Sequence, residues 1–239
     1  MHHDWFTLVT VEHASNAVPE GIDLGVPPEA LETHAAWDPG AKEVGSIVAA
    51  DLYAPMFLGR YTRLVADLNR NPENPAVVPE VGYGVTVPAN IGLSPEQRAR
   101  RLATFHRPFW QRVRETIDGA LAVGPRERRI LHLSIHSFTG EFEGEVRPMS
   151  MGVMFDPARP LERHVADLLL TGLERLGVHA VENQPYDGRS DSHTTFLRRQ
   201  IPADRYAGVQ IEVSQNHLDE IEALGHRLLQ TVQWLKAVD

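Results

Sequence analysis

The 239-residue sequence contains no cysteine. This absence excludes disulfide frameworks, thiolate nucleophiles and cysteine-based zinc sites, so a metal ion would need histidine, carboxylate or amide ligands. It also fits a reducing compartment. No apolar stretch approaches the roughly 20 residues that a membrane-spanning helix needs. We therefore expect a cytoplasmic protein that has no membrane partner.

Basic runs are missing as well. The formal charge is −9, from 23 basic and 32 acidic residues, and this balance argues against nucleic acid as a partner. The first five residues include His2, His3 and Asp4 in place of a basic and then apolar segment, so no signal peptide is expected. An anionic ligand would need a local basic pocket, which makes individual arginines worth locating.

Two catalytic signatures are also absent. The sequence has no glycine-rich phosphate loop, which argues against nucleotide chemistry. Ser15 and Ser137 each neighbour a histidine, but no G-x-S-x-G elbow supports a serine nucleophile.

What is present is an alternation of strand-like and helix-like segments in one domain, residues 1–239. Expected strands span residues 6–12, 60–66, 129–135, 151–155, 178–182 and 207–213, and expected helices span 41–57, 94–117, 161–176 and 218–238. Such alternation favours helices on both faces of a largely parallel sheet. The polar, proline-rich stretch 71–92 is expected to be a binding loop or lid.

Polar side chains occur at the carboxyl ends of several expected strands. They are His13, Asn69, Arg70, His136 and, within the last turn of its strand, Glu212. Ligands in open α/β sheets bind outside the carboxyl ends of the strands. We therefore expect these residues to converge on one crevice.

The two histidines are candidate metal ligands. Neutral imidazoles at neighbouring strand ends could bind zinc with a third, oxygen ligand and an open position for water. Alternatively, His13 and His136 only form hydrogen bonds in their loops. Asp38 precedes an expected helix, so it could be either a metal ligand or a helix cap.

Glu212 is a carboxylate in an otherwise apolar strand, where a charge must be paired or functional. It could be a general base, or it could pair with Arg198 or Arg199. Asn69 and Arg70 could bind a substrate carboxylate, or Arg70 could be a solvated loop charge. The segment SDSHTT around His193 is expected to be a polar, mobile loop.

Four segments, VEHASNAVP, DLNRNP, SIHSF and QIEVSQ, resemble the N-formylglutamate amidohydrolase family, which is similar to the zinc carboxypeptidases. The resemblance spans roughly residues 6–218 and keeps the order His, Asn-Arg, His, Glu. It implies a three-layer α/β/α fold with a mostly parallel mixed sheet, of the phosphorylase/hydrolase-like (zinc exopeptidase-like) type.

The resemblance also implies roles. His13 and His136 would hold zinc, Glu212 would be the catalytic base, and Asn69 and Arg70 would bind a substrate carboxylate. Arg147, in the loop after His136, is expected to bind a second carboxylate. The implied reaction hydrolyses N-formyl-L-glutamate to formate and L-glutamate.

One departure from the carboxypeptidase pattern concerns the third ligand. Those enzymes use H-x-x-E, whereas Asn16 stands where that glutamate would be. The third ligand is therefore expected to be Asp38, with Asn16 or a water as alternatives. Two rival functions stay open: hydrolysis of another N-acyl amino acid or peptide, and non-catalytic binding of an acidic ligand on a degenerate hydrolase fold.

Overall fold

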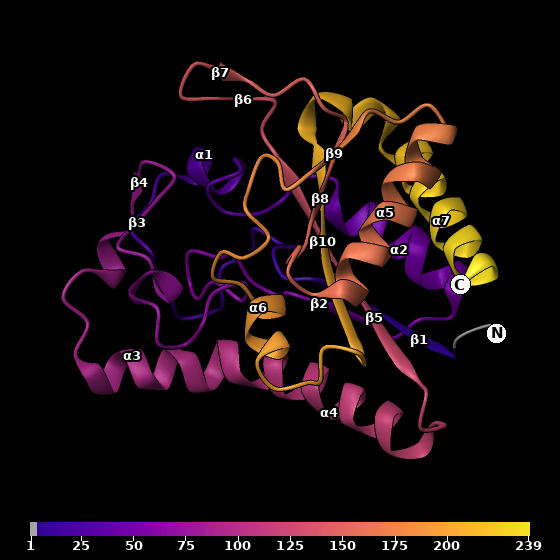
Figure 1. Ribbon diagram of the computed structural model, residues 1–239. Coiled ribbons are helices and arrows are strands. Elements are labelled where there is room, and N and C mark those ends of the chain that lie inside the picture. Colours follow the sequence, from indigo (N-terminus) through magenta and orange to yellow (C-terminus); the bar gives the residue numbers. More distant parts are fainter. Residues whose placement is uncertain (1–3) are drawn as a thin grey trace.

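The computed structural model describes residues 4–239, and a six-stranded sheet crosses this part of the chain in the order β2-β1-β5-β10-β8-β9 (Figure 1). Its strands are β1 (Trp5–Val11), β2 (Met56–Leu58), β5 (Arg129–Phe138), β8 (Met151–Met154), β9 (Ala180–Glu182) and β10 (Tyr206–Ser214). Neighbouring strands run parallel except β10 and β8, which are antiparallel. Residues 1–3, part of the segment where no signal peptide is expected, lie outside the described residues.

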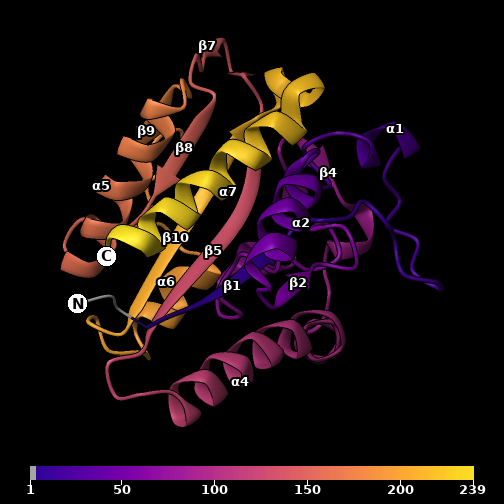
Figure 2. The same ribbon diagram turned by 90° about the vertical axis from the view of Figure 1, so that its right-hand side faces the viewer.

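Helices cover both faces of this sheet, which confirms the expected three-layer α/β fold (Figures 1 and 2). One face packs against α2 (Ala41–Leu52), α5 (Pro160–Arg175) and α7 (Ile221–Val238). The other packs against α4 (Arg107–Val123) and α6 (His193–Arg198). None of the helices within residues 4–239 is long and apolar enough to cross a membrane.

The main core forms because apolar residues alternate along the central strands. Val9, Leu133, Ile135, Val209 and Ile211 are all fully buried in the cluster beneath α2, α5 and α7. Burying each such side chain contributes roughly 1.5–3 kcal/mol. The residues between them face α4 and α6, so a polar residue at an intervening position is directed to that opposite face.

Two expected elements were wrong. Residues 60–66 are irregular and not a strand, because their backbone bonds to loops: Thr62 N donates to Ala17 O, and Arg63 N donates to Ala36 O. The helix expected to reach residue 57 ends at Leu52, since Tyr53 adopts the left-handed conformation with φ 50°. The chain then enters the edge strand β2.

The remaining elements surround the carboxyl end of the sheet. They are α1 (Pro28–Leu31), β3 (Val81–Gly82), β4 (Val85–Thr86), α3 (Pro95–Arg101), β6 (Glu141–Phe142), β7 (Glu145–Val146) and 3₁₀ turns at Pro75–Val77, Pro88–Asn90 and Gln215–Glu220. Helix α3 begins with the capping box of Ser94 and Gln97, and a π-helical turn, Leu102–His106, joins it to α4. Pro108 therefore lies in the first turn of α4, where a proline is tolerated.

Candidate active site

A cavity of about 360 Å³ lies at the carboxyl end of the sheet, on the face that carries α4 and α6. Its lining includes His13, Asp38, Asn69, His136 and Glu212. The structure thus brings together residues that are up to 199 positions apart in the sequence, since Glu212 follows His13 by that number. The volume is within the roughly 300–1,000 Å³ of small-molecule sites.

The floor of this cavity is a patch of polar residues on the central strands. Ser134 and His136 of β5 lie opposite Gln210 and Glu212 of β10 in the strand register. Glu12 follows β1 directly and accepts a hydrogen bond from Ser134 Oγ at 2.9 Å, so it belongs to the same patch. These side chains alternate with the apolar residues of the main core. His136, Gln210 and Glu212 line the cavity, whereas Ser134 and Glu12 are buried and lie outside its lining.

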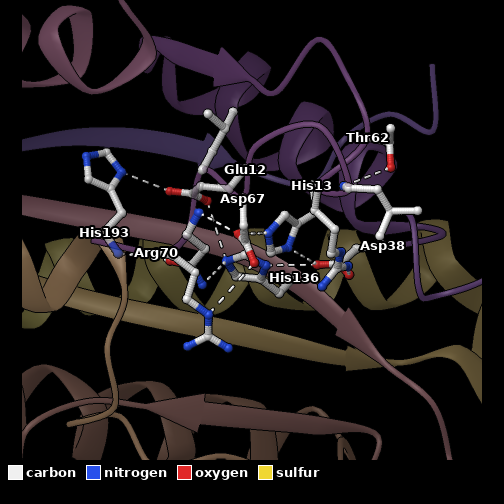
Figure 3. Close-up of polar contacts among 12 residues, drawn as sticks. Glu12, His13, Asp38, Thr62, Asp67, Arg70, His136 and His193 are labelled. Atoms are coloured by element: carbon white, nitrogen blue, oxygen red, sulfur yellow. Dashed lines mark hydrogen bonds and ion pairs between the residues drawn. The ribbon is translucent and has the colours of Figure 1, made fainter. Parts of the chain in front are cut away.

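His13, Asp38 and His136 form a compact group at the centre (Figure 3). The Nδ1 atoms of His13 and His136 lie 3.2 Å and 2.8 Å from Oδ2 of Asp38. All three residues are at most 4% exposed, and one ligand atom from each lies within 4.8 Å of the others. Two imidazole nitrogens and a carboxylate oxygen that converge in this way make a donor set that suits a zinc ion.

The opposite ring nitrogens of the two histidines meet further polar groups. Nε2 of His13 lies 2.7 Å from Asp67 Oδ1. Nε2 of His136 lies 3.0 Å from Ser134 Oγ and 3.4 Å from Glu12 Oε2. Both nitrogens of each ring thus face a carboxylate, since Nδ1 lies near Asp38; a metal ion that replaced the Nδ1 contact would leave the proton on Nε2. Each Nδ1 is then available to a metal ion, and a carboxylate behind a ligating histidine strengthens such a ligand.

Arg63 gives this acidic group a fixed positive charge. Its guanidinium pairs with Oδ1 of Asp38, which leaves Oδ2 to the two histidines. Although burial alone would raise the pKa of Asp38, Arg63 and His13 hold it well below its usual value. His34 Nδ1 lies 3.4 Å from the same Oδ1, and burial lowers the pKa of His34 to about 4.

Glu212 is 6% exposed and lines the same cavity. Its Oε2 has no hydrogen-bond partner among residues 4–239. Burial and the nearby charge of Asp38 raise its pKa well above the usual value, against the opposing charges of Arg63 and Arg147. This environment favours the protonated form of the Glu212 carboxyl group more than water does, as expected for a group that binds and releases a proton during a reaction.

The salt bridges considered for Glu212 do not form. Arg198 donates to Glu162 Oε1 at 2.9 Å, and the Arg199 guanidinium lies 6.0 Å from the centre of the Phe196 ring. Arg198 is the last residue of α6 and Arg199 is its C-cap, and both are engaged by these contacts.

Asn69 and Arg70 both line the cavity. Asn69 Nδ2 donates to Gln210 Oε1 at 3.0 Å, and Arg70 Nη1 donates to the Asp191 carbonyl at 2.9 Å. The Arg70 side chain is 39% exposed, and its Nε lies 3.8 Å from Asp67 Oδ2. Arg70 is thus only partly occupied by protein contacts.

Arg147 and Asn16 lie farther from the central group. The Arg147 guanidinium packs 5.5 Å from the ring of Tyr186, which lines the cavity. Its Nη1 is buried without a hydrogen-bond partner among the described residues. Asn16 donates through Nδ2 to Glu32 Oε1 at 3.1 Å, so the structure does not bring its amide to the histidines.

Two short hairpins lie near the cavity, and one of them contributes to its lining. Tyr83 lies between β3 and β4, lines the cavity, and meets the His34 ring edge-on at 4.7 Å. Its ring centre is 6.1 Å from that of Phe142, which belongs to the β6–β7 hairpin. The loop expected at residues 71–92 therefore does contribute to the site, through Tyr83.

Several residues of the site were missed from the sequence. Glu12, Arg63 and Asp67 stand beside or within the motifs, but no periodicity indicates that their side chains meet the histidines. Glu12 contacts Nε2 of His136, whereas Nδ1 of the same ring faces Asp38. In the segment SDSHTT, where a loop was expected, residues 190–192 are irregular, whereas His193 begins α6.

Comparison with known proteins relates the chain to one family. Residues 6–218 match the sequence profile of the N-formylglutamate amidohydrolase family. The crystal structure of a gene product from Agrobacterium tumefaciens is similar over 99% of this chain and 92% of its own, with 30% identity and a TM-score of 0.86. That of N-formylglutamate amidohydrolase from Ralstonia eutropha JMP134 covers 98% of this chain and 95% of its own, with 18% identity and a TM-score of 0.69.

No curated protein matches the chain at a significant level. The family match nevertheless covers far more than half of the sequence, and it includes every strand that forms the cavity floor. The chain belongs to the N-formylglutamate amidohydrolase family.

Proposed function

We propose that the protein is a zinc-dependent amidohydrolase that acts on a small acidic N-acyl amino acid, with N-formyl-L-glutamate as the leading substrate. The observation that carries the proposal is the convergence of two Nδ1 atoms, from His13 and His136, on Asp38 Oδ2 inside the cavity. Family membership supports the amide-hydrolysing chemistry and the substrate class.

His13, His136 and Asp38 would hold the zinc ion. Asp38 supplies the carboxylate oxygen that Asn16 lacks, and this favours a catalytic protein over a binder on a degenerate fold. When bound, zinc would polarise the amide carbonyl and acidify water. Arg63, beside Asp38, adds a positive charge that favours the negative charge developing on the carbonyl oxygen.

Glu212 would be the general base. Its raised pKa and its unpartnered Oε2 suit a group that takes a proton from the attacking water and returns it to the departing amine nitrogen. Asn69 and Arg70 would bind one substrate carboxylate and so fix the amide over the central group. Arg147, beside Tyr186, would meet the second carboxylate.

Formate release tests this proposal. Purified protein supplied with zinc is expected to hydrolyse N-formyl-L-glutamate, with lower kcat/KM for N-acetyl-L-glutamate and for glutamyl peptides. A chelator is expected to stop the reaction, and added zinc to restore it. Activity that survives complete chelation would show that the reaction needs no metal ion. A preference for N-acetyl or peptide substrates would show that the formyl group is not the acyl group of the natural substrate.

A further inference from the structure

A buried histidine on α6 lies close to the candidate metal ligands His13, Asp38 and His136, although it is not one of them. His193 is the first residue of α6, is fully buried, and follows the N-cap Ser192. In Figure 3 its ring lies on the far side of Glu12 from His136. None of the roles proposed above uses it.

Glu12 connects the two histidines. Nδ1 of His193 lies 3.0 Å from Glu12 Oε1, while Glu12 Oε2 accepts from Ser134 Oγ at 2.9 Å and lies 3.4 Å from Nε2 of His136. A carboxylate is held in one orientation when donors occupy both of its oxygens. His193 is the partner of Oε1, and without it that oxygen has no donor in this group.

The surroundings of His193 determine which nitrogen carries its proton. Glu12 can only accept, so Nδ1 of His193 must donate. Nε2 is buried with no hydrogen-bond partner among residues 4–239, and an unpaired lone pair costs less there than an unpaired N–H. The ring stacks on Trp110 at 4.6 Å and 18°. Trp110 is itself held by its hydrogen bond to the Leu68 carbonyl at 2.7 Å.

His193 also contacts Asn69, which lines the cavity. Its backbone N–H donates to Asn69 Oδ1 at 3.0 Å, and Asn69 in turn donates to Gln210 Oε1. The same residue therefore contacts the carboxylate behind one candidate ligand and the amide proposed to bind substrate.

A competing interpretation is a second metal site, since Glu12, His132 and His193 also offer three ligand atoms within 4.8 Å of one another. The hydrogen bonds of His132 argue against it. One ring nitrogen lies 2.9 Å from Thr10 Oγ1, and the other lies 2.7 Å from the Tyr206 hydroxyl. Both nitrogens of His132 are thus already engaged.

We propose that His193 is a positioning residue: its Nδ1–H fixes the Glu12 carboxylate, and Glu12 then keeps the His136 ring turned with Nδ1 toward Asp38. This inference rests on the proposed function, because it concerns the orientation of a candidate zinc ligand. Losing a hydrogen bond behind a ligating histidine lowers metal affinity by about 10–100-fold.

Variants of His193 test the inference through zinc affinity, measured by competition with a chromophoric chelator. His193→Phe keeps the ring on Trp110 but removes the donor, and we expect zinc binding about 10–100-fold weaker. His193→Asn places an amide donor near the Nδ1 position, and affinity is expected to return to within about threefold of wild type. His193→Gln, whose amide extends toward the Nε2 position, is expected to behave like His193→Phe and replaces it if that variant does not fold.

His132→Phe is the matched control, since His132 is equally buried on the same face but bonds to Thr10 and Tyr206. It is expected to lower thermal stability and to leave zinc affinity near that of wild type. Unchanged affinity in His193→Phe, or an equal loss in His132→Phe, overturns the inference.

Crystal structures of the metal-free protein separate this inference from the proposed function. If wild type binds no zinc, the proposed function fails, but the positioning role is still decided by comparing wild type with His193→Phe. We expect the Glu12 carboxylate to turn away from His136 in the variant. A Glu12–His136 pair that superimposes on wild type contradicts the role of His193.

Discussion

Glu212 of β10 lies directly opposite His136 of β5 in the parallel register, so the two side chains share the face that forms the cavity floor. This relationship places a carboxyl group of raised pKa beside a candidate zinc ligand. Replacing Glu212 with Gln keeps the shape but removes the proton acceptor. We expect kcat to fall by roughly 10²–10⁴, the usual contribution of general acid–base catalysis.

Substrate binding distinguishes this effect from a disrupted site. Calorimetry with N-formyl-L-glutamate is expected to give Glu212→Gln a Kd close to the KM of wild type, because the substrate carboxylates are assigned to other residues. Glu222→Gln, an exposed glutamate on α7, serves as control and should retain full activity. A Glu212→Gln enzyme that turns over normally would remove Glu212 from the mechanism.

The third metal ligand can be decided by a pair of substitutions. Asp38→Asn removes the charged oxygen on which both Nδ1 atoms converge, so zinc affinity should fall by more than the roughly 10–100-fold typical of groups behind a ligand. Asn16→Ala removes the amide that donates to Glu32, and zinc affinity should not change. The opposite result for the two variants would assign the third ligand to Asn16.

The sequence predicted most of the fold because its strands and helices carry clear periodicities and caps. Residues 129–135 and 207–213 alternate correctly, and Ser94 with Gln97 does form the expected capping box. The strand predicted at residues 60–66 was wrong because this segment is as apolar as a strand but is buried by packing under loops. Local pattern cannot distinguish these two environments.

Some residues of the candidate site could likewise be predicted from the sequence, and others could not. His13 and His136 were found because each lies at a strand end, where topology alone brings them together. The pairing of Asp38 with Arg63, and of Glu12 with His193, depends on how segments 25 to 181 residues apart in sequence meet in space. No spacing rule encodes such contacts, so these residues were missed or left among alternatives.

Zinc binding is expected to depend on pH through His13. Burial and Arg63 lower the pKa of His13, but Asp67 and Asp38 outweigh them, and the pKa is raised above the ordinary value of 6.5. Below that raised pKa both ring nitrogens carry protons, and zinc must displace the proton on Nδ1. Affinity should therefore fall as pH decreases through the pKa of His13, and level off above it.

Calorimetry in buffers of different ionisation enthalpy measures the proton released. Asp67→Asn removes a charge that raises the pKa of His13, so the midpoint of the pH dependence should move to lower pH. An unchanged midpoint would mean that His13 does not control the competition between zinc and protons.

The two proposed carboxylate-binding arginines can be separated with a substrate that lacks the side-chain charge. Arg70→Gln should raise KM for both N-formyl-L-glutamate and N-formyl-L-glutamine, if Arg70 binds the α-carboxylate that both share. Arg147→Gln should raise KM only for the glutamate compound. A hydrogen bond to a charged group contributes about 1.5–3 kcal/mol, so each affected KM should rise roughly 10- to 150-fold.

Arg112→Gln, an exposed arginine on α4, is the control and should leave both KM values unchanged. The pattern follows from placement: Arg70 lines the cavity beside Asn69, whereas Arg147 approaches it from behind Tyr186 with an unpartnered Nη1 among the described residues. If Arg147→Gln affected both substrates equally, Arg147 would act by holding Tyr186 in place and not by binding the second carboxylate. Equal and full activity of both variants would assign the substrate charges to Arg63, the other arginine besides Arg70 that lines the cavity among residues 4–239.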